Sequence, residues 1–536
     1  MFKAILNANY RKKGNAISYL ISYDLGTGGV KASLYDRHLQ TIARSFTEYA
    51  TYYPQPHYHE QRPEDWWQGV AQSTHQLLSI SGIDATDITC VSLSGHSLVS
   101  VPIHRTEGAL LEQVPIWSDK RAEAEAATFF NEVNEQQWYL RTGNGFPAAC
   151  YPLFKLMWMQ KHQPDIFARA DVMLGSKDYI NYRLTGAIYT DPSYASGLGA
   201  YDLKQGGVAD ELLEAAGIPA HLFPAIVPSH EQIGQVTAEA AAYTGLAEGT
   251  PVACGGVDNA CMALGAVGSE QGRSYVSLGS SSWIPVNSAE PVLDVDTRPY
   301  VFAHIAEGMY TSAYSIFAGG SSLRWVRDQL CAELAGREDA YDRMNEMAAS
   351  APPGSNGVLF DPSLAGGTSQ DNSIYIQGSY IGLQLATTRN DLIRAAMEGI
   401  ALNLKLALDL LNEHTPIHSQ LLFCGGGSRS ALWRQIFADI FDMDIVKTNI
   451  DQDAASLGAA AIAARAVGWW QDYRGIADVH QVEHISHPEP ISRDLYQRLL
   501  PVFQHVHEQT AALGEYMHRH TLEQKEYSST YSQMEE

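Results

Sequence analysis

The sequence is poor in cysteine, poor in basic residues and without a long hydrophobic run. Its 536 residues include six cysteines and no Cys-x-x-Cys pair. Neither a disulfide frame nor a zinc cluster is therefore expected, and a reducing compartment, the cytoplasm, is favoured. Lys and Arg number 36 against 60 Asp and Glu, a formal charge of −24, which disfavours partnership with nucleic acid or an anionic membrane. The sequence contains no run of about 18 apolar residues, so no membrane-spanning helix is predicted.

The chain is long, and its composition is that of a globular protein, with 45% hydrophobic and 18% charged residues. At about 100–200 residues per domain, this length predicts more than one domain. We expect an N-terminal extension at 1–17, two domains at 18–268 and 269–517, and a polar, disordered tail at 518–536. A homodimer is left open.

Strands and helices alternate along the chain, which predicts an α/β protein. A strand–turn–strand–turn–strand unit covers 19–49, and a related hairpin at 274–287 opens the second half. The two units indicate two related halves. Further strands are expected at 88–93, 251–253 and 420–424, and helices at 63–79, 121–133, 151–163, 321–335, 391–412, 430–441 and 454–469. Asn390 or Asp391 is the expected N-cap of the longest of these helices.

The segment DLGTGG places an acid at a strand end, directly before a small, glycine-rich turn. The Asp24 carboxylate can hold Mg²⁺, directly or through water. The turn of Gly26, Thr27, Gly28 and Gly29 can offer backbone N–H groups and a hydroxyl to phosphate oxygens. Taken alone, a segment of this kind is more often a purely structural hairpin turn.

Three more segments have chemical potential. In GGVDNA, Asp258 follows two glycines at a strand end and suits a general base toward a hydroxyl, or else a turn or N-cap residue. In LGSSS, Gly279 and Ser280 form a second phosphate-type turn. The triple glycine of Gly425, Gly426 and Gly427 lies between a strand and a helix, where it suits a nucleotide platform or a tight turn.

In this order, the segments resemble the FGGY carbohydrate kinases of the actin-like ATPase superfamily. The resemblance runs from Tyr19 to Tyr496. Further matching motifs are EQRPEDWW at 60–67, WSDKR at 117–121, LFKLMW at 153–158, GSYIGL at 378–383 and DAASLGAA at 453–460. The combination is far more specific than any one segment.

The resemblance implies two RNase H-like domains flanking a deep cleft, and transfer of phosphate from Mg-ATP to a hydroxyl of a small sugar. Asp24 would organise Mg²⁺, and Asp258 would be the base. The implied nucleotide site comprises Gly26, Thr27, Gly28, Gly29, Gly279, Ser280, Gly320, Arg324, Gly425, Gly426, Gly427 and Ser430. The implied sugar site comprises His96, Ser97, Trp117, Asp119, Asp258 and Asn259.

The sequence departs from the family pattern at Cys150, at Asp453, which stands for Glu, and at two places in the expected site. Gly28 and Gly29 replace a usual Ser/Thr pair, and His96-Ser97-Leu98 replaces the Gln-Met-His of xylulokinases and the Gln-Arg-Glu of glycerol kinases. A ketopentose of the xylulose type is the expected substrate, with an autoinducer-2 kinase or a polyol kinase as alternatives. A nucleotide-binding sensor without catalysis is the alternative from another class, and the presence of both aspartates favours the enzyme. With Leu98 at a usually polar position, we expect weak activity on glycerol and imperfect activity on D-xylulose.

Overall fold

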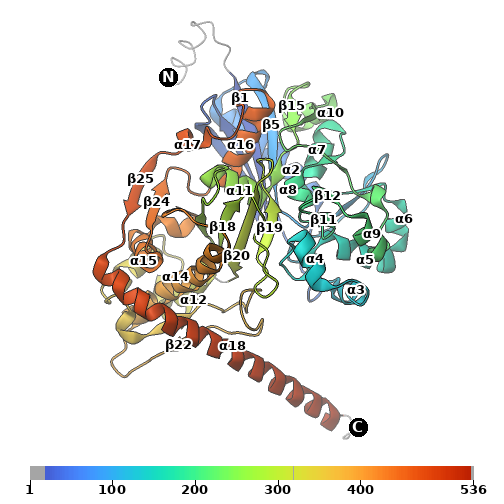
Figure 1. The fold of residues 1–536 in the computed structure, drawn as a ribbon. Coiled ribbons are helices and arrows are strands. Elements are labelled where there is room, and N and C mark those ends of the chain that lie inside the picture. Colours follow the sequence, from blue (N-terminus) through green and yellow to red (C-terminus); the bar gives the residue numbers. More distant parts are fainter. Residues whose placement is uncertain (1–17, 318, 533–536) are drawn as a thin grey trace, which may run out of the picture.

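Two seven-stranded sheets form the framework of the computed structural model, which describes residues 18–317 and 319–532 (Figure 1). The extension expected at 1–17 lies outside the described residues. Helices cover the sheets, so the α/β class expected from the sequence is confirmed. Within the described residues, no helix combines the length and hydropathy that crossing a bilayer requires.

The first sheet is built around three parallel strands in the order β15, β5 and β1. On the β1 side, β2 and then β3 continue the sheet antiparallel, and on the β15 side the antiparallel strand β14 forms the edge. The short strand β16 (Gly256–Val257) also pairs with β5. The other bounds are β1 Tyr19–Gly26, β2 Gly29–Tyr35, β3 Thr41–Glu48, β5 Ile88–Gly95, β14 Gln232–Gln235 and β15 Pro251–Ala253.

The second sheet repeats the order and the strand directions of the first. Strands β20, β18 and β17 are antiparallel, β17, β23 and β24 are parallel, and β25 closes the edge antiparallel. Strand β19 extends the other edge. The bounds are β17 Tyr275–Leu278, β18 Ser282–Ser288, β19 Tyr300–Ala303, β20 Tyr310–Ile316, β23 Gln420–Cys424, β24 Asp444–Thr448 and β25 Val482–Ser486. The two related halves expected from the hairpins are therefore present.

The main helices follow the expected positions with shifted ends. In the first half they are α2 Pro63–Ser81, α3 Glu123–Phe129, α4 Glu135–Thr142, α5 Pro152–His162, α7 Ser176–Thr185, α8 Pro192–Ala195, α10 Ala238–Thr244 and α11 Asp258–Val267. In the second half they are α12 Gly319–Leu330, α13 Ala340–Ala349, α14 Arg389–His414, α15 Ala431–Phe441, α16 Ala454–Ala466, α17 Ile476–Val479 and α18 Pro490–Ser532. The lobe with α3, α4 and α5 meets the second sheet at β19, where the Val301 N–H donates to the Gly143 carbonyl at 2.8 Å.

Helices α11 and α16 pack against each other where the two halves meet, and α16 also packs on β1 and β5 of the first sheet. Glycines permit this close crossing. A Cβ at Gly458 would overlap the carbonyl oxygen of Cys261, and one at Gly265 would overlap that of Ala454. A helix from the second half therefore covers the sheet of the first, so the division expected at residue 268 is not a division of the hydrophobic core.

Helix α18 runs diagonally across the second half and continues to Ser532 (Figure 1). The disordered tail expected at 518–536 is thus helical over 518–532, and its last four residues lie outside the described residues. At the start of this stretch Arg519 pairs with Glu515, four residues earlier, at 3.1 Å, a spacing that stabilises a helix. Nearer its start, His507 bridges Asp361 and Asp371 at 2.8 Å each, which fixes α18 to the second half.

Candidate active site

Asp24 lies on β1, two residues before the first hairpin turn. It pairs with Lys31 across the hairpin and with Ser94 on the parallel strand β5, whose hydroxyl donates to the carboxylate at 2.9 Å. Burial raises the pKa of Asp24, while the Lys31 charge and the Ser94 hydrogen bond oppose that rise. The carboxylate is therefore desolvated and only partly compensated, which suits a cation ligand.

Asp258 is the first residue of α11 and follows β15 through a tight glycine turn. Gly255 has φ +79°, and a Cβ there would meet the carbonyl of Leu93, so the chain can make this turn only with glycine. One Asp258 oxygen accepts the N–H of Asn259 at 2.8 Å. Burial, with the charge of Asp24 added to it, raises the pKa of Asp258 to about 7. A carboxylate with this pKa is matched to take a proton near neutral pH.

The first hairpin turn is Thr27-Gly28, closed by pairing of Gly26 with Gly29. Both turn residues are exposed, and nothing lies within 4 Å of a Cβ placed at Gly28. Gly29 differs, because a Cβ there would meet the Thr47 carbonyl at 2.5 Å. The turn thus leaves its backbone open toward a ligand on one side and packs on β3 on the other.

The second turn, Gly279-Ser280-Ser281, is also exposed and is braced by the start of α12. Gly320 donates its N–H to the Gly279 carbonyl at 2.8 Å, and Arg324 donates to the Ser280 hydroxyl at 3.0 Å. A side chain at Gly320 would collide with the same carbonyl. Four of the residues expected at the nucleotide are therefore brought together.

The triple glycine packs beside the second turn. Gly425 has φ +87° and would meet the Leu278 carbonyl with a Cβ, and Gly427 lies against the Leu278 side chain. The chain then makes a 3₁₀ turn, Gly426–Arg429, and Ser430 caps α15 by accepting the Trp433 N–H at 3.1 Å. The short turn before the helix was not expected from the sequence.

Side chains of the first half reach across to this glycine segment. Lys31 donates to the carbonyl of Gln452 at 2.7 Å and pairs with Asp453 at 3.1 Å, and Arg44 pairs with the same carboxylate at 2.6 Å. The Gln452 amide lies 3.8 Å from a Cβ placed at Gly426. Asp24 and the triple glycine are thereby linked through Lys31, which sequence reasoning did not single out.

The segment WSDKR lies next to the first turn. Trp117 donates from Nε1 to the Thr27 hydroxyl at 3.0 Å, which ties the expected sugar side to the expected phosphate side. Asp119 is fully buried and accepts from Arg121 at 2.9 and 2.8 Å and from the His59 N–H at 2.7 Å. Because both of its oxygens are engaged, Asp119 holds this segment in place. Asn259 is half-buried beside Asp258.

The residues after β5 are less open than expected. His96 is 1% exposed, and burial lowers its pKa to about 4, so it is neutral. Its Nδ1 lies 3.2 Å from the Leu25 carbonyl, and its Nε2 is buried without a hydrogen-bond partner among the described residues. Ser97 is half-buried.

Leu98 does not present its side chain to solvent. It is 2% exposed, has φ +59° and packs in an apolar cluster with Tyr151 and Phe154. Lys155, itself buried, donates to the carbonyls of Leu98 and Ile116 at 2.9 and 2.7 Å. The expectation that residue 98 faces a sugar hydroxyl therefore has no support in the geometry.

A groove of 730 Å³ lies between the two halves. Lys120 and Phe146 line it from the first half, and Tyr300, Thr368 and Asn372 line it from the second. Lys120 belongs to the WSDKR segment, so the groove reaches that segment, but neither Asp24 nor Asp258 lines it. A small polar substrate can therefore approach the WSDKR segment from between the halves.

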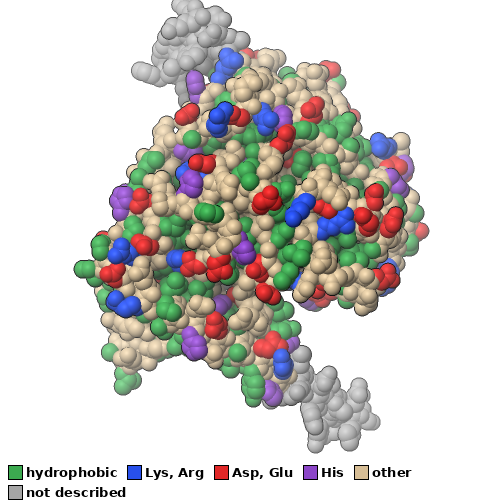
Figure 2. Space-filling view, viewed as in Figure 1, with side chains coloured by type: hydrophobic (Ala, Val, Ile, Leu, Met, Phe, Trp, Pro, Cys, Tyr) green, Lys and Arg blue, Asp and Glu red, His purple; other side chains and the backbone are tan. Residues whose placement is uncertain are grey.

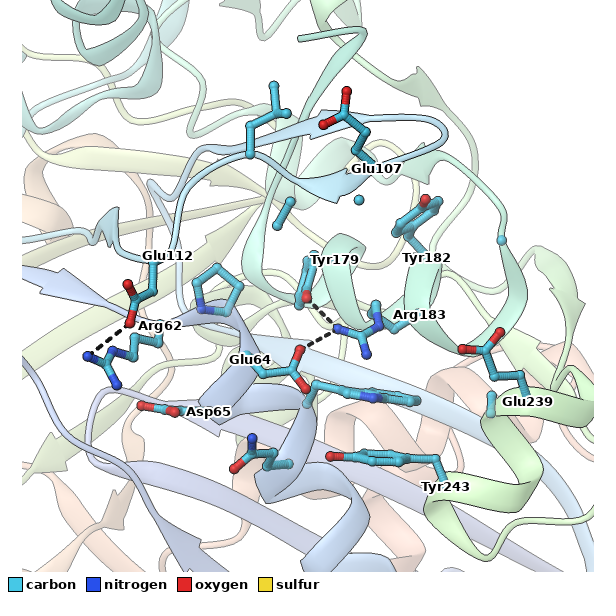
Figure 3. Close-up of a pocket in the computed structure, with 18 of the residues that line it drawn as sticks. Arg62, Glu64, Asp65, Glu107, Glu112, Tyr179, Tyr182, Arg183, Glu239 and Tyr243 are labelled. Atoms are coloured by element: carbon cyan, nitrogen blue, oxygen red, sulfur yellow. Dashed lines mark hydrogen bonds and ion pairs between the residues drawn. The ribbon is translucent and has the colours of Figure 1, made fainter. Parts of the chain in front are cut away.

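A wider hollow, of 1290 Å³, lies on the outside of the first half, and neither Asp24 nor Asp258 lines it (Figure 3). Its arginines are already neutralised, Arg62 by Glu112 at 3.1 Å and Arg183 by Glu64 at 2.7 Å. On the face shown in Figure 2, Lys and Arg side chains are scattered among acidic ones and form no basic patch. Volume alone therefore does not mark the site.

Family models match both halves of the chain. The N-terminal domain of the FGGY family of carbohydrate kinases matches residues 19–265, and the C-terminal domain matches residues 274–467. This chain belongs to that family. The predicted resemblance and the two actin-like ATPase domains are confirmed.

Several named kinases match this chain over nearly their whole length. A xylulose kinase of Bacillus subtilis is 29% identical over 93% of this chain and 98% of its own, and a gluconokinase of Bacillus licheniformis is 30% identical over 91% and 95%. An autoinducer-2 kinase of Escherichia coli is 30% identical over 89% and 92%. A solved xylulose kinase from Rhodospirillum rubrum superposes with a TM-score of 0.83 at 28% identity, covering 93% of this chain and all of its own. The protein is thus a carbohydrate kinase that transfers phosphate from ATP to a sugar.

Proposed function

We propose that this kinase phosphorylates a hydroxyl of a ketopentose of the xylulose type, with Asp258 as general base and Asp24 as the Mg²⁺ ligand. The observation that carries the proposal is the pair of desolvated aspartates beside two open small-residue turns. Asp258 has a pKa of about 7, so its carboxylate is present at neutral pH yet basic enough to accept a hydroxyl proton.

In this proposal the turns stabilise the charge on the transferred phosphate, and Asp258 activates the sugar hydroxyl. The backbone of Thr27, Gly28 and Ser280 offers N–H groups where negative charge develops, and fixed donors of this kind stabilise the transition state. Asp258 orients the sugar hydroxyl and takes its proton as the oxygen attacks phosphorus. Closure of the two halves around both substrates would exclude water and so limit ATP hydrolysis.

The aspartates also fit a divalent cation. Burial raises the pKa of each aspartate, and the charge of Asp24 raises the pKa of Asp258 further. A cation at Asp24 would therefore favour the ionised form of both carboxyl groups. The described residues contain no cluster of three or more metal-ligating side chains, which agrees with Mg²⁺ held by one or two carboxylates and by phosphate oxygens. Bound there, Mg²⁺ would neutralise charge on the transferring phosphate.

Two observations bear on the sugar and on the compartment. The motifs WSDKR and GGVDNA favour a ketopentose, and xylulose kinases are among the relatives, as are a gluconokinase and an autoinducer-2 kinase. All six cysteines are free and buried, which supports a reducing compartment such as the cytoplasm.

The experiment is ADP release with Mg-ATP and a panel of D-xylulose, other ketopentoses, gluconate, glycerol and the autoinducer. We expect a ketopentose to give the highest kcat/KM, and we expect Asp258→Asn to lower kcat on it by about 10²–10⁴-fold while ADP still binds. A ketopentose outside the top of the panel refutes the substrate assignment. An Asp258→Asn enzyme with wild-type kcat refutes the base assignment.

A further inference from the structure

The strand–turn segment that ends in Asp258 is fixed by a buried polar network that the mechanism above does not use. Cys254, Gly255 and Val257 each form a hydrogen bond to a residue outside their own segment. The Cys254 carbonyl accepts from Lys177 at 3.3 Å and from Asn181 at 2.8 Å. The Gly255 N–H donates to the Ser229 carbonyl at 2.9 Å. Three of the four residues before the proposed base are thus tied to α7, to α8 or to the chain after α8.

The last of these contacts is the one nearest the base. Val257 is the N-cap position of α11 and has no side-chain oxygen with which to cap the helix. Its own N–H donates to the Ser193 hydroxyl at 3.0 Å. Val257 and Ser193 are 1% and 0% exposed, so no water can replace this partner without opening the fold.

The Ser193 hydroxyl is itself oriented. It donates to Oδ2 of Asp191, which also accepts from the Ser229 hydroxyl at 2.8 Å. Lys177 lies 3.1 Å from the other Asp191 oxygen, and both side chains are fully buried. Because Asp191 can only accept as a carboxylate, the Ser193 proton points to it and a lone pair points to Val257.

We infer that Ser193 is a positioning residue for the phosphoryl transfer. Its hydroxyl holds the Val257 peptide, and so fixes the direction in which the first residue of α11 presents its carboxylate. The inference rests on the proposed role of Asp258. A base displaced by about 1 Å can lose up to about 100-fold in rate, and Asn259, which is expected at the sugar, follows the same peptide.

Ser193→Ala tests this, because it removes the acceptor for the Val257 N–H and adds no bulk. We expect kcat to fall about 10–100-fold, with KM for ATP within about 2-fold of wild type. Ser193→Cys keeps a weaker acceptor of similar shape and should give an intermediate kcat. The matched control is Ser229→Ala, which loses a hydrogen bond to the same Asp191 oxygen but none to residues 256–258; its kcat should stay within about 2-fold.

Thermal unfolding and ADP affinity are measured for every variant, and Ser193→Cys carries the test if Ser193→Ala does not fold. A kcat loss in the Ser193 variants no larger than in Ser229→Ala overturns the inference. A double-mutant cycle separates it from the proposed function. In Asp258→Asn, Ser193→Ala should lower the residual kcat by less than about 2-fold, and an undiminished effect overturns the positioning role. Wild-type kcat in Asp258→Asn alone refutes the base assignment instead.

Discussion

At the scale of single residues, the proton on Asp258 is the quantity that the site controls most directly. An ordinary aspartate titrates near pH 4, but burial and the charge of Asp24 raise the pKa of Asp258 to about 7. Below that pH the carboxyl is protonated and cannot accept the hydroxyl proton. We therefore expect kcat/KM for Mg-ATP, which reports the enzyme before the cation binds at Asp24, to rise with pH and to reach half its maximum near pH 7 with the best sugar of the panel. A profile that is flat from pH 5 to pH 8 would contradict a base with a raised pKa.

Single residues also show what local sequence can and cannot reveal. Asp24, Asp258 and the small turns could be predicted because strand, acid and glycine are neighbours in the chain. Ser193 could not, because its partner Val257 is 64 residues away and no pattern near it marks the contact. The expectation that residue 98 lies at the sugar fails for a related reason, because the motif does not show where the side chain packs. The positive φ of Leu98 turns the side chain into the apolar cluster.

Among the elements, helix positions were predicted better than helix ends. Helix α14 was expected to begin at Asn390 or Asp391, but its N-cap is Thr388, with Asp391 closing a capping box from the third position. The helix expected at 121–133 is confined to Glu123–Phe129. Hydrophobic periodicity marks the buried face of a helix, whereas its ends depend on which backbone groups find partners, and at α14 that partner is the local pair of Thr388 and Asp391.

The crossing of α11 and α16 gives a prediction at the same scale. In Gly458→Ala the added methyl would overlap the Cys261 carbonyl, so the helices must separate, and overpacking of this kind costs about 1–3 kcal/mol. We expect a lower midpoint in thermal unfolding, with Gly207→Ala as the control, since a Cβ at Gly207 has nothing within 4 Å. Equal midpoints for the two variants would show that the crossing tolerates a side chain.

For the whole molecule, the shared core means that neither half is an independent folding unit. Residues 18–268 alone would leave the faces of β1 and β5 that α16 covers exposed to water. We expect this fragment to lack a cooperative thermal transition by circular dichroism, and co-expression with residues 269–536 to restore a soluble complex with activity. A fragment that unfolds cooperatively on its own would contradict this expectation.

The matching strand order of the two sheets places β17 where β1 lies in the first sheet, and Ser277-Leu278-Gly279-Ser280 where Asp24-Leu25-Gly26-Thr27 lies. The scaffold is thus close to a repeated unit, but the phosphoryl donor and the acceptor are unlike molecules. The two copies must therefore differ in chemistry, and at this position they do: the side chain is the Asp24 carboxylate in one copy and the Ser277 hydroxyl in the other. A polyanion held between two such turns meets fixed negative charge from one copy only, which gives an almost symmetrical frame a direction.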